Sequence, residues 1–285
     1  MRSFFWNLLP RSRAFRSGLF DSAPKGSLLL SDIGSETFLV ASNDLAIGRE
    51  VFRRGTYDFE KLQRAVSMLP EGFEPKLLID VGANIGTICI PAIKRNLFQT
   101  GIAIEPEPRN YSLLIANLHL NGVQRRIQPH NLALGAKPGE TLVFELSEIN
   151  FGDHRVRMSS EVGQSGEESR KTIEVKSETF DDVVGSVDPK ATLIWMDTQG
   201  FEGYVLAGAI GALRKKPPVV IEFWPYGLER SGSYGALKRA LVEAGYESFY
   251  NLDGSQEAHR LSEESLDQLA RKLGFDEAYT DLLVC

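Results

Sequence analysis

The chain has 285 residues, of which 42% are hydrophobic and 25% are charged, a composition typical of an ordinary globular protein. The formal net charge of −6 argues against a general nucleic-acid binder, because such proteins usually carry a basic face. Two cysteines, Cys89 and Cys285, argue against a disulfide framework and favour a reducing compartment. No apolar run approaches the roughly 20 residues that a membrane span requires, so we expect a cytoplasmic protein.

Residues 1–25 form a basic and aromatic N-terminal segment that differs from the rest of the chain. In residues 1–20 the only charged side chains are four arginines, interleaved with eight aromatic or leucine side chains. One interpretation is an amphipathic element that lies on an anionic membrane surface or on a partner protein. The interpretation that we favour is a terminal extension that packs on its own domain or is disordered. A signal peptide is not expected, because the apolar run is short and arginines follow it.

Residues 26–76 are predicted to form a short β-rich extension and a helix that leads into the main domain. Three apolar runs separated by turn residues predict short strands at 28–30, 37–40 and 45–47. The apolar spacing over 57–69 predicts a helix, which Pro70 would end.

The main domain, residues 77–285, begins with the stretch around which we expect the fold to be organised. An apolar run starting at Leu77 predicts a strand covered on both faces, and Asp80 follows at its carboxyl end. Gly82 and Gly86 bracket the next turn, where glycine permits a sharp bend and a close approach to a ligand. The apolar pattern after the loop predicts a helix whose free N–H groups face that ligand. Together these features indicate a nucleotide-type pocket at a sheet edge.

A second acid indicates a ligand that contains a ribose. The apolar run 101–104 leads to Glu105 and then Pro106, and an acid at this strand end can accept hydrogen bonds from a ribose diol. The same spacing fits an NAD site, but the loop lacks the G-x-G-x-x-G pattern, so no glycine stands where a pyrophosphate needs the closest backbone approach. A ligand with a ribose and no phosphates fits better, and S-adenosylmethionine is such a ligand.

The rest of the main domain alternates strands and helices. Five more apolar runs predict sheet strands at 127–134, 193–196, 219–221, 247–252 and 280–284. Helical spacing predicts helices at 88–93, 108–120, from 202 to about 213, 234–244 and 263–273. The fold class predicted is therefore α/β, with a seven-stranded, mostly parallel sheet and helices on both faces.

A polar stretch interrupts this alternation at 147–171, between predicted strands at 141–146 and 172–176. A loop of that length in a compact domain is either functional or disordered. We interpret it as a mobile cover over the acceptor site, and simple disorder is the alternative.

In combination, these motifs resemble the FkbM-type methyltransferase family over about residues 55–225. The resemblance is carried by the D-V-G-A-N-I-G loop, by Glu105-Pro106 about 25 residues after Asp80, and by D-x-x-G-x-E beginning at Asp197. It implies a class I, Rossmann-like fold and S-adenosylmethionine as cofactor, and generally O-methylation of sugars, glycans or secondary metabolites. One departure is that members often have K-I-D-V-E-G where residues 195–200 read W-M-D-T-Q-G, which leaves the acceptor-side chemistry open.

The cofactor roles follow from this placement. We expect Asp80 and Gly82 to hold the methionine end and Glu105 to take the ribose hydroxyls. Asn131 would face the adenine, and Asn84 would contact the carboxylate or fix the turn. The full set of predicted cofactor-binding residues is Asp80, Gly82, Asn84, Gly86, Glu105, Pro106 and Asn131.

An alcohol acceptor must lose a proton on methylation, so a base must lie within hydrogen-bond reach. Asp197 is the first candidate because its strand end would lie beside the transferred methyl group, and Glu202, Glu222 and His154 follow. The first two could instead cap or neutralise a helix start, and His154 could be an inert loop residue. Asp197 and Glu222 could together hold Mg²⁺, but no motif fixes a ligand set, so no metal is predicted.

Other function classes stay open. An NAD-dependent sugar oxidoreductase or epimerase would keep the nucleotide pocket, although the missing glycine pattern weighs against it. A non-catalytic scaffold would bind the cofactor and anchor a partner through residues 1–20. Nucleic-acid methylation is a weaker option, because the chain is acidic and lacks an Asn-Pro-Pro-Tyr motif after the Asp197 strand. The partner we expect is a small-molecule or glycan acceptor.

Overall fold

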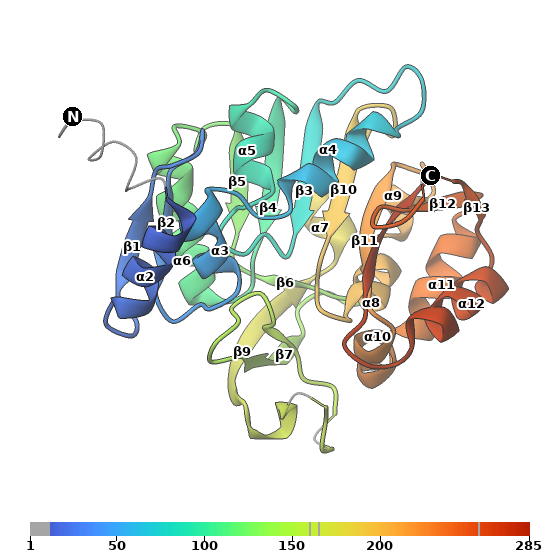
Figure 1. Ribbon diagram of the computed structural model, residues 1–285. Helices are drawn as coiled ribbons and strands as arrows, with labels where there is room; N and C mark the ends of the chain where they lie inside the picture. The colour runs from blue at the N-terminus through green and yellow to red at the C-terminus, as the bar shows by residue number, and fades with distance from the viewer. Residues whose placement is uncertain (1–11, 160, 165, 256) are drawn as a thin grey trace.

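An eight-stranded sheet forms the centre of the computed structural model, which describes residues 12–159, 161–164, 166–255 and 257–285 (Figure 1). In sheet order the strands are β13 (His259–Arg260), β12 (Ser248–Asn251), β14 (Thr280–Val284), β11 (Val219–Phe223), β10 (Thr192–Met196), β3 (Leu77–Val81), β4 (Thr100–Ile104) and β5 (Ile127–His130). Each neighbouring pair from β11 to β5 is parallel. Strand β14 is antiparallel to both β11 and β12.

This sheet confirms the predicted α/β class I fold. Seven of the strands correspond to the seven predicted ones, and the eighth is β13, which pairs with β12 at the edge of the sheet. A strand of two residues is too short to show an apolar period, so the sequence pattern could not reveal it.

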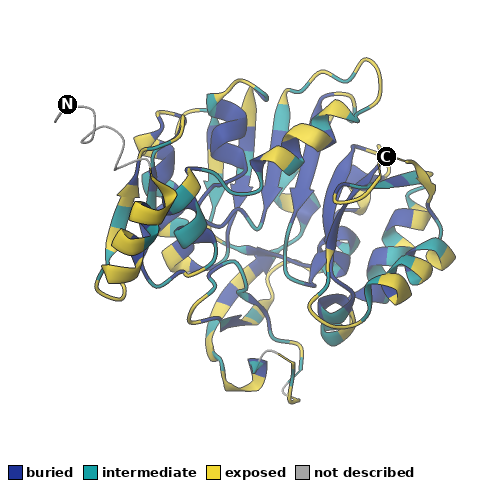
Figure 2. Cartoon of the chain, in the orientation of Figure 1, coloured by how far each residue is buried: buried dark blue, intermediate teal, exposed yellow. Residues whose placement is uncertain are grey.

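Helices cover both faces of the sheet because the central strands are apolar on both sides. On β10, Leu193 and Trp195 belong to one apolar core, whereas Ile194 and Met196 belong to the other. The first core is covered by helices from the N-terminal half of the chain: α3 (Ile47–Arg54), α4 (Phe59–Ser67), α5 (Cys89–Lys94) and α6 (Pro108–Leu120). The second is covered mainly by α8 (Glu202–Ala207), α9 (Ile210–Leu213), α11 (Tyr234–Glu243) and α12 (Glu263–Leu273). Figure 2 shows the strands as the buried layer and the outer helix faces as exposed.

The N-terminal region packs on the first core. Strands β1 (Leu28–Ser31) and β2 (Phe38–Ala41) pair as an antiparallel hairpin. The predicted strand at 45–47 is wrong: these residues lead into α3, because the Asp44 carboxylate accepts hydrogen bonds from the backbone N–H groups of Ala46 and Gly48 and so caps the helix start.

Helix α2 (Arg13–Ser22) is the described part of the basic and aromatic segment. Its Phe20 is buried against Phe52, with ring centroids 5.7 Å apart, and the Arg16 guanidinium donates to the Ser31 hydroxyl over 3.0 Å. This part therefore packs on its own domain, and residues 1–11, where the other half of the predicted amphipathic segment falls, lie outside the described residues. No helix in the described part of the chain is long and apolar enough to cross a membrane.

A second, four-stranded sheet adjoins the lower end of the main sheet in Figure 1. Its order is β6 (Ala133–Leu134), β9 (Lys171–Glu178), β7 (Thr141–Leu146) and β8 (Arg155–Val156). The predicted strand at 127–134 is thus split between two sheets. The break falls at Asn131, whose side-chain amide donates to the carbonyls of Glu105 and Pro106 and holds the chain in a turn.

The other connecting elements are short. They are the 3-10 turn η2 (Glu167–Ser169), α7 (Phe180–Val184) and α10 (Pro225–Ser231). The carboxylate of Asp181 in α7 accepts from the backbone N–H groups of Gly211 and Ala212, so this acid has a structural role at the start of α9.

Candidate active site

A cavity of about 360 Å³ opens where the carboxyl ends of the parallel strands meet. We call one wall the β3–β4 side; it comprises Asp80, Gly82, Asn84, Glu105 and Pro106. We call a second wall the β10–β14 side; it comprises Asp197, Gln199, Glu222, Tyr279 and Asp281. Residues 150–156 of the second sheet also line the cavity. Of the predicted site residues, Gly86, Asn131 and Glu202 are not among the lining residues.

Gly82 must be a glycine because the loop is pressed against the end of β10. Its φ is +86°, and a Cβ there would lie 1.8 Å from the carbonyl oxygen of Asp197. Its N–H donates to the Ile104 carbonyl over 2.9 Å, which fixes the loop against β4 as well. We predicted glycine here for a close approach to a ligand; the structure adds a close approach to a neighbouring strand. Gly86 has a φ of +92°, and its Cβ would meet Ile90 at 2.5 Å, so it serves the turn.

Backbone N–H groups hold both acids of the β3–β4 side. The carboxylate oxygens of Glu105 accept from the backbone N–H groups of Asn84 and Glu107, each over 2.8 Å. Asp80 accepts from the backbone N–H of Cys89 over 3.1 Å. Burial raises the pKa of Asp80 to about 7 and that of Glu105 to about 8, against the opposing effect of these hydrogen bonds.

The segment after β7 closes over the β3–β4 side. The carbonyl oxygen of Phe151 accepts from the side-chain amides of Asn84 (2.8 Å) and Asn110 (3.0 Å). These contacts place the first part of the predicted cover beside the predicted cofactor loop, and its role over the acceptor site stays a prediction. Asn110, on α6, was not predicted as a site residue. Its partner Phe151 is 41 residues away in the sequence, and no local pattern around Asn110 indicates that contact.

His154 lines the cavity but is poorly placed to be a base. Its Nδ1 accepts from the backbone N–H of Ser147 over 3.0 Å, so the neutral imidazole carries its proton on Nε2. Burial, and secondarily the cations of Arg170 and Arg109, lowers its pKa to about 4. The ring is therefore neutral at physiological pH, and its Nδ1 lone pair is already used. These contacts favour the alternative of an inert loop residue, and a proton-accepting role for His154 stays a prediction.

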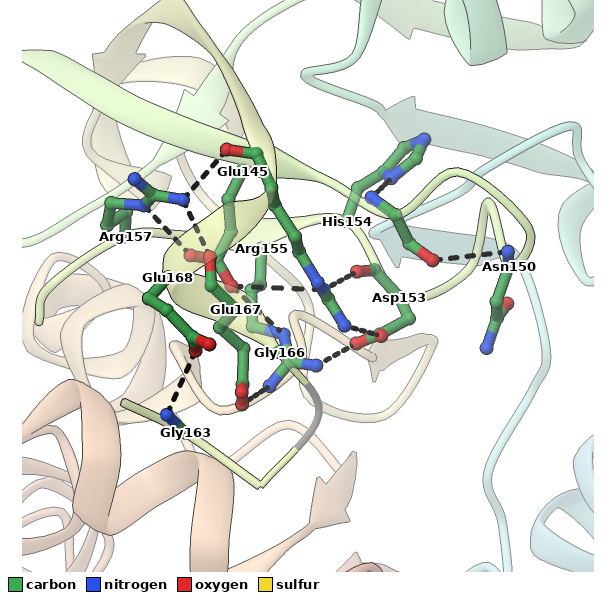
Figure 3. A network of polar contacts seen from close by, with 12 residues as sticks. Glu145, Asn150, Asp153, His154, Arg155, Arg157, Gly163, Gly166, Glu167 and Glu168 are labelled. Carbon is green, nitrogen blue, oxygen red and sulfur yellow. Dashed lines mark hydrogen bonds and ion pairs between the residues drawn. The ribbon is translucent and has the colours of Figure 1, made fainter. Parts of the chain in front are cut away.

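Buried ion pairs fix the rest of this segment (Figure 3). The side chain of Arg155 is 6% exposed and pairs with Asp153 and with Glu167, the latter over 3.3 Å. Its guanidinium lies 4.7 Å from the ring centroid of Trp224, and both residues line the cavity. The predicted polar loop thus contains a charged core of its own. Removal of one partner from such a network leaves an uncompensated buried charge.

On the β10–β14 side, one amide links two carboxyl groups. The Gln199 Nε2 donates to Asp197 Oδ1 over 2.8 Å and to Glu222 Oε2 over 2.9 Å. Burial raises the pKa of both acids, and the charge of Asp197 raises the pKa of Glu222 further. The structure therefore brings the two predicted base candidates together, through a residue that the sequence showed only as a departure from the family pattern.

A third acid of this side, Asp281, is paired with a lysine side chain. Lys61 Nζ lies 2.5 Å from Asp281 Oδ2 and 3.3 Å from Asp253 Oδ1. Burial outweighs this attraction and raises the pKa of Asp281 to about 7, although Asp281 in turn raises the pKa of Lys61. Because the partners are 220 residues apart, no local pattern could have found them.

Glu202 has no access to the cavity. It is fully buried, and its Oε1 accepts from the backbone N–H of Thr198 (2.8 Å), the Thr198 hydroxyl (2.9 Å) and the backbone N–H of Gly200 (3.3 Å). It is the first residue of α8, so these contacts fit the structural alternative at a helix start. These contacts give no support to a role of Glu202 as a base, which stays a prediction. Among the described residues, no three His, Cys, Asp or Glu side chains are grouped to hold a metal ion.

Comparison with known proteins gives one family match. The Methyltransferase FkbM domain model matches residues 80–248. Among solved structures, the chain is similar to a methyltransferase FkbM from Methylobacillus flagellatus KT, with 19% identity, a TM-score of 0.46, and coverage of 77% of this chain and 45% of that one. It therefore spans less than half of that protein's length.

Two other solved structures show a comparable likeness. One is TYW2 of M. jannaschii in complex with AdoMet, with 14% identity, a TM-score of 0.46, and coverage of 92% of this chain and 86% of that one. The other is a precorrin-6y C5,15-methyltransferase from Geobacter metallireducens, with 12% identity, a TM-score of 0.41, and coverage of 87% and 92%. A search of curated protein sequences found no match.

Proposed function

The chain belongs to the FkbM family of methyltransferases, whose methyl donor is S-adenosylmethionine, and we propose that it methylates a hydroxyl oxygen of a sugar, glycan or secondary metabolite. The observation that carries the proposal is the division of one cavity into two acidic sides. The β3–β4 side holds acids on backbone N–H groups, and the β10–β14 side holds a linked pair of carboxyls within the same enclosure.

The charges of the cavity fit the cofactor. S-Adenosylmethionine carries a sulfonium and an ammonium cation, and opposite charges in a partly desolvated site attract strongly. Among the described lining residues, Arg155 is the only lysine or arginine, whereas carboxyl side chains occur on every wall. Arg155 is itself paired with Asp153 and Glu167, so its charge does not oppose a cationic ligand.

The β3–β4 side offers each part of the cofactor a partner. Each Glu105 oxygen uses one lone pair for a backbone N–H and keeps acceptor capacity for a ribose hydroxyl. Asp80 and the Gly82 loop would hold the methionine end. The Asn84 side chain already binds the Phe151 carbonyl and the Ile85 N–H, so we assign it to fixing the turn. Asn131 likewise binds backbone carbonyls, and its contact with adenine stays a prediction.

The β10–β14 side would bind the acceptor and take its proton. When bound, the cofactor supplies an electrophilic methyl group, and the electron pair of the broken carbon–sulfur bond stays on sulfur. Asp197 or Glu222 accepts the hydroxyl proton while the hydroxyl oxygen uses its electron pair to bond the methyl carbon. Tyr57, Trp224 and Tyr279 line the cavity near these acids, and apolar ring faces with a few polar groups are typical of small-molecule sites.

The test is methyl transfer from labelled S-adenosylmethionine to a panel of hydroxylated sugars and glycans. We expect the wild-type protein to label at least one acceptor, and Asp197→Asn to lower kcat by about 100-fold or more, the usual contribution of a general base. Asp253→Asn is the matched control, because it removes another carboxylate that lies near Lys61 but is not among the cavity-lining residues. Unchanged kcat in both Asp197→Asn and Glu222→Gln would refute the assigned base. Cofactor binding without transfer to any hydroxyl would refute the acceptor class.

A further inference from the structure

Asp197 and Glu222 hydrogen-bond each other directly through their carboxyl groups. We propose that Gln199 is a positioning residue that holds this pair as one proton-sharing unit. The inference rests on the proposed function, because it concerns how that pair would accept the proton of an acceptor hydroxyl. The family resemblance presents Gln199 as a departure from the glutamate that members often have, and the geometry of the site gives this departure a chemical consequence.

The geometry of the amide supports the inference. A glutamine –NH₂ group has two hydrogens and no charge, and the Gln199 nitrogen lies almost equally far from Asp197 Oδ1 (2.8 Å) and Glu222 Oε2 (2.9 Å). One hydrogen can therefore serve each carboxyl at the same time. All three side chains line the cavity, so the pair faces the space in which an acceptor would bind.

The backbone holds the amide in this position. Gln199 has a φ of +55°. This left-handed backbone conformation is uncommon for residues other than glycine, asparagine and aspartate. Gly200 follows with a φ of +93°, and a Cβ there would lie 2.4 Å from the carbonyl carbon of Gly227. The turn is thus fixed by its packing against α10. An unusual conformation that packing over-determines is a common feature of functional sites.

The surrounding charges make a neutral donor important. The groups that interact electrostatically with the pair are Asp58, Lys61, Asp80, Glu202 and Asp281, together with Tyr57 and Tyr279. Lys61 is the only cation among them, and it is paired with Asp281 and Asp253. Two neighbouring carboxyls in such surroundings do not both ionise, so the pair retains one proton.

Glutamine suits this pair better than any charged residue. An arginine or lysine at position 199 would hold both carboxyls ionised and make them weak bases, whereas a glutamate would add a third negative charge and raise their pKa. The amide stabilises either carboxylate without changing the total charge. During methyl transfer the acceptor O–H bond breaks, its proton passes to the ionised carboxylate, and its electron pair forms the oxygen–methyl bond. The doubly protonated pair then returns one proton to water.

The test compares Gln199→Glu and Gln199→Met with wild type in the pH dependence of kcat/KM. Gln199→Glu keeps the shape but removes both donors, so we expect the acidic limb to move up by about one pH unit or more and kcat to fall about tenfold, with cofactor affinity retained. Gln199→Met should move the limb in the same direction, because the carboxylate loses its donors. The matched control is Gln268→Glu, which alters an exposed glutamine that also donates to a carboxylate, Glu264, on the remote helix α12.

A lower kcat with an unmoved pH limb would overturn the inference, since a merely structural role would have that effect. If the variants fail to fold, carbon NMR titration of the Asp197 and Glu222 carboxyls in the wild-type protein decides the matter. Two coupled steps are expected, and the signals of the Gln199 side-chain amide should shift with them. Two independent single steps, or amide signals that do not respond to the titration, would overturn the inference. This titration needs no acceptor, so its outcome is separate from a failure of the wild-type protein to methylate any hydroxyl.

Discussion

The two sides of the cavity hold their acids in different ways. On the β3–β4 side, Glu105 accepts hydrogen bonds from the backbone N–H groups of Asn84 and Glu107, and Asp80 accepts one from the backbone N–H of Cys89. On the β10–β14 side, Asp197, Glu222 and Asp281 are held by side chains, namely those of Gln199 and Lys61. Backbone donors keep a carboxylate in a fixed position, whereas side-chain partners allow its proton to be shared or moved. The first arrangement suits a cofactor that binds in one pose, and the second suits acid–base chemistry.

Gly82→Ala should break the contact between the two sides and have the largest effect. The new Cβ would fall 1.8 Å from the Asp197 carbonyl oxygen at a φ of +86°, so either the loop or the end of β10 must move. We expect the free energy of unfolding, measured with urea, to fall by about 3 kcal/mol or more. Gly139→Ala is the control, with a φ of +72° and nothing within 4 Å, and should cost about 1 kcal/mol. Equal losses would show that the contact between the sides is unimportant.

Lys61→Met should weaken only the β10–β14 side. The change leaves the buried Asp281 without its cation, which we expect to cost about 3 kcal/mol in the free energy of unfolding at pH 8. The loss should shrink below pH 6, because Asp281 has a pKa of about 7 and becomes neutral there. Lys238→Met removes a more exposed pair with Asp267 and should cost about 1 kcal/mol or less. A loss from Lys61→Met that does not change with pH would contradict the assigned partner.

Glu202→Gln tests a buried acid that belongs to neither side of the cavity, and it therefore provides a reference for the acids of the two sides. Burial raises the pKa of Glu202 from 4.5 to about 7 in the folded state, so the unfolded chain ionises first and the folded state loses relative stability as the pH rises from about 4.5 to 7. Glutamine does not ionise, so the variant should gain up to about 3 kcal/mol relative to wild type between pH 5 and pH 8. Thermal unfolding at both pH values measures this difference. A parallel response of the two proteins would show that Glu202 ionises normally.

Features that depend on neighbouring residues could be predicted from the sequence, and features that depend on distant partners could not. The strands and the acids at their ends could be predicted because each apolar run and the residue after it are neighbours in the sequence, as at Asp80, Glu105 and Asp197. The strand at 45–47 was wrong because three apolar residues do not distinguish a strand from the start of a helix capped by Asp44.

The rest of the site depends on partners that are distant in the chain. The Lys61–Asp281 pair and the two amides on the Phe151 carbonyl arise only when the fold is complete. Gln199 was visible in the sequence, but its function requires Glu222 to lie beside Asp197, and periodicity says nothing of that. His154 and Glu202 were suitable side chains in the right region, and only the hydrogen bonds of the folded chain favour a structural role for each.

Calorimetric titration with S-adenosylmethionine tests the central claim, that the β3–β4 side binds the cofactor and the β10–β14 side does not. Wild type should bind, and Asp197→Asn should bind like wild type. Glu105→Gln should bind about 10-fold to 100-fold more weakly, because an amide –NH₂ group replaces one of the two oxygens that accept hydrogen bonds. Glu107→Gln is the control, since Glu107 caps α6 through the N–H of Asn110 and is not among the cavity-lining residues. If the folded wild-type protein does not bind, or if Asp197→Asn loses binding while Glu105→Gln retains it, the account is contradicted.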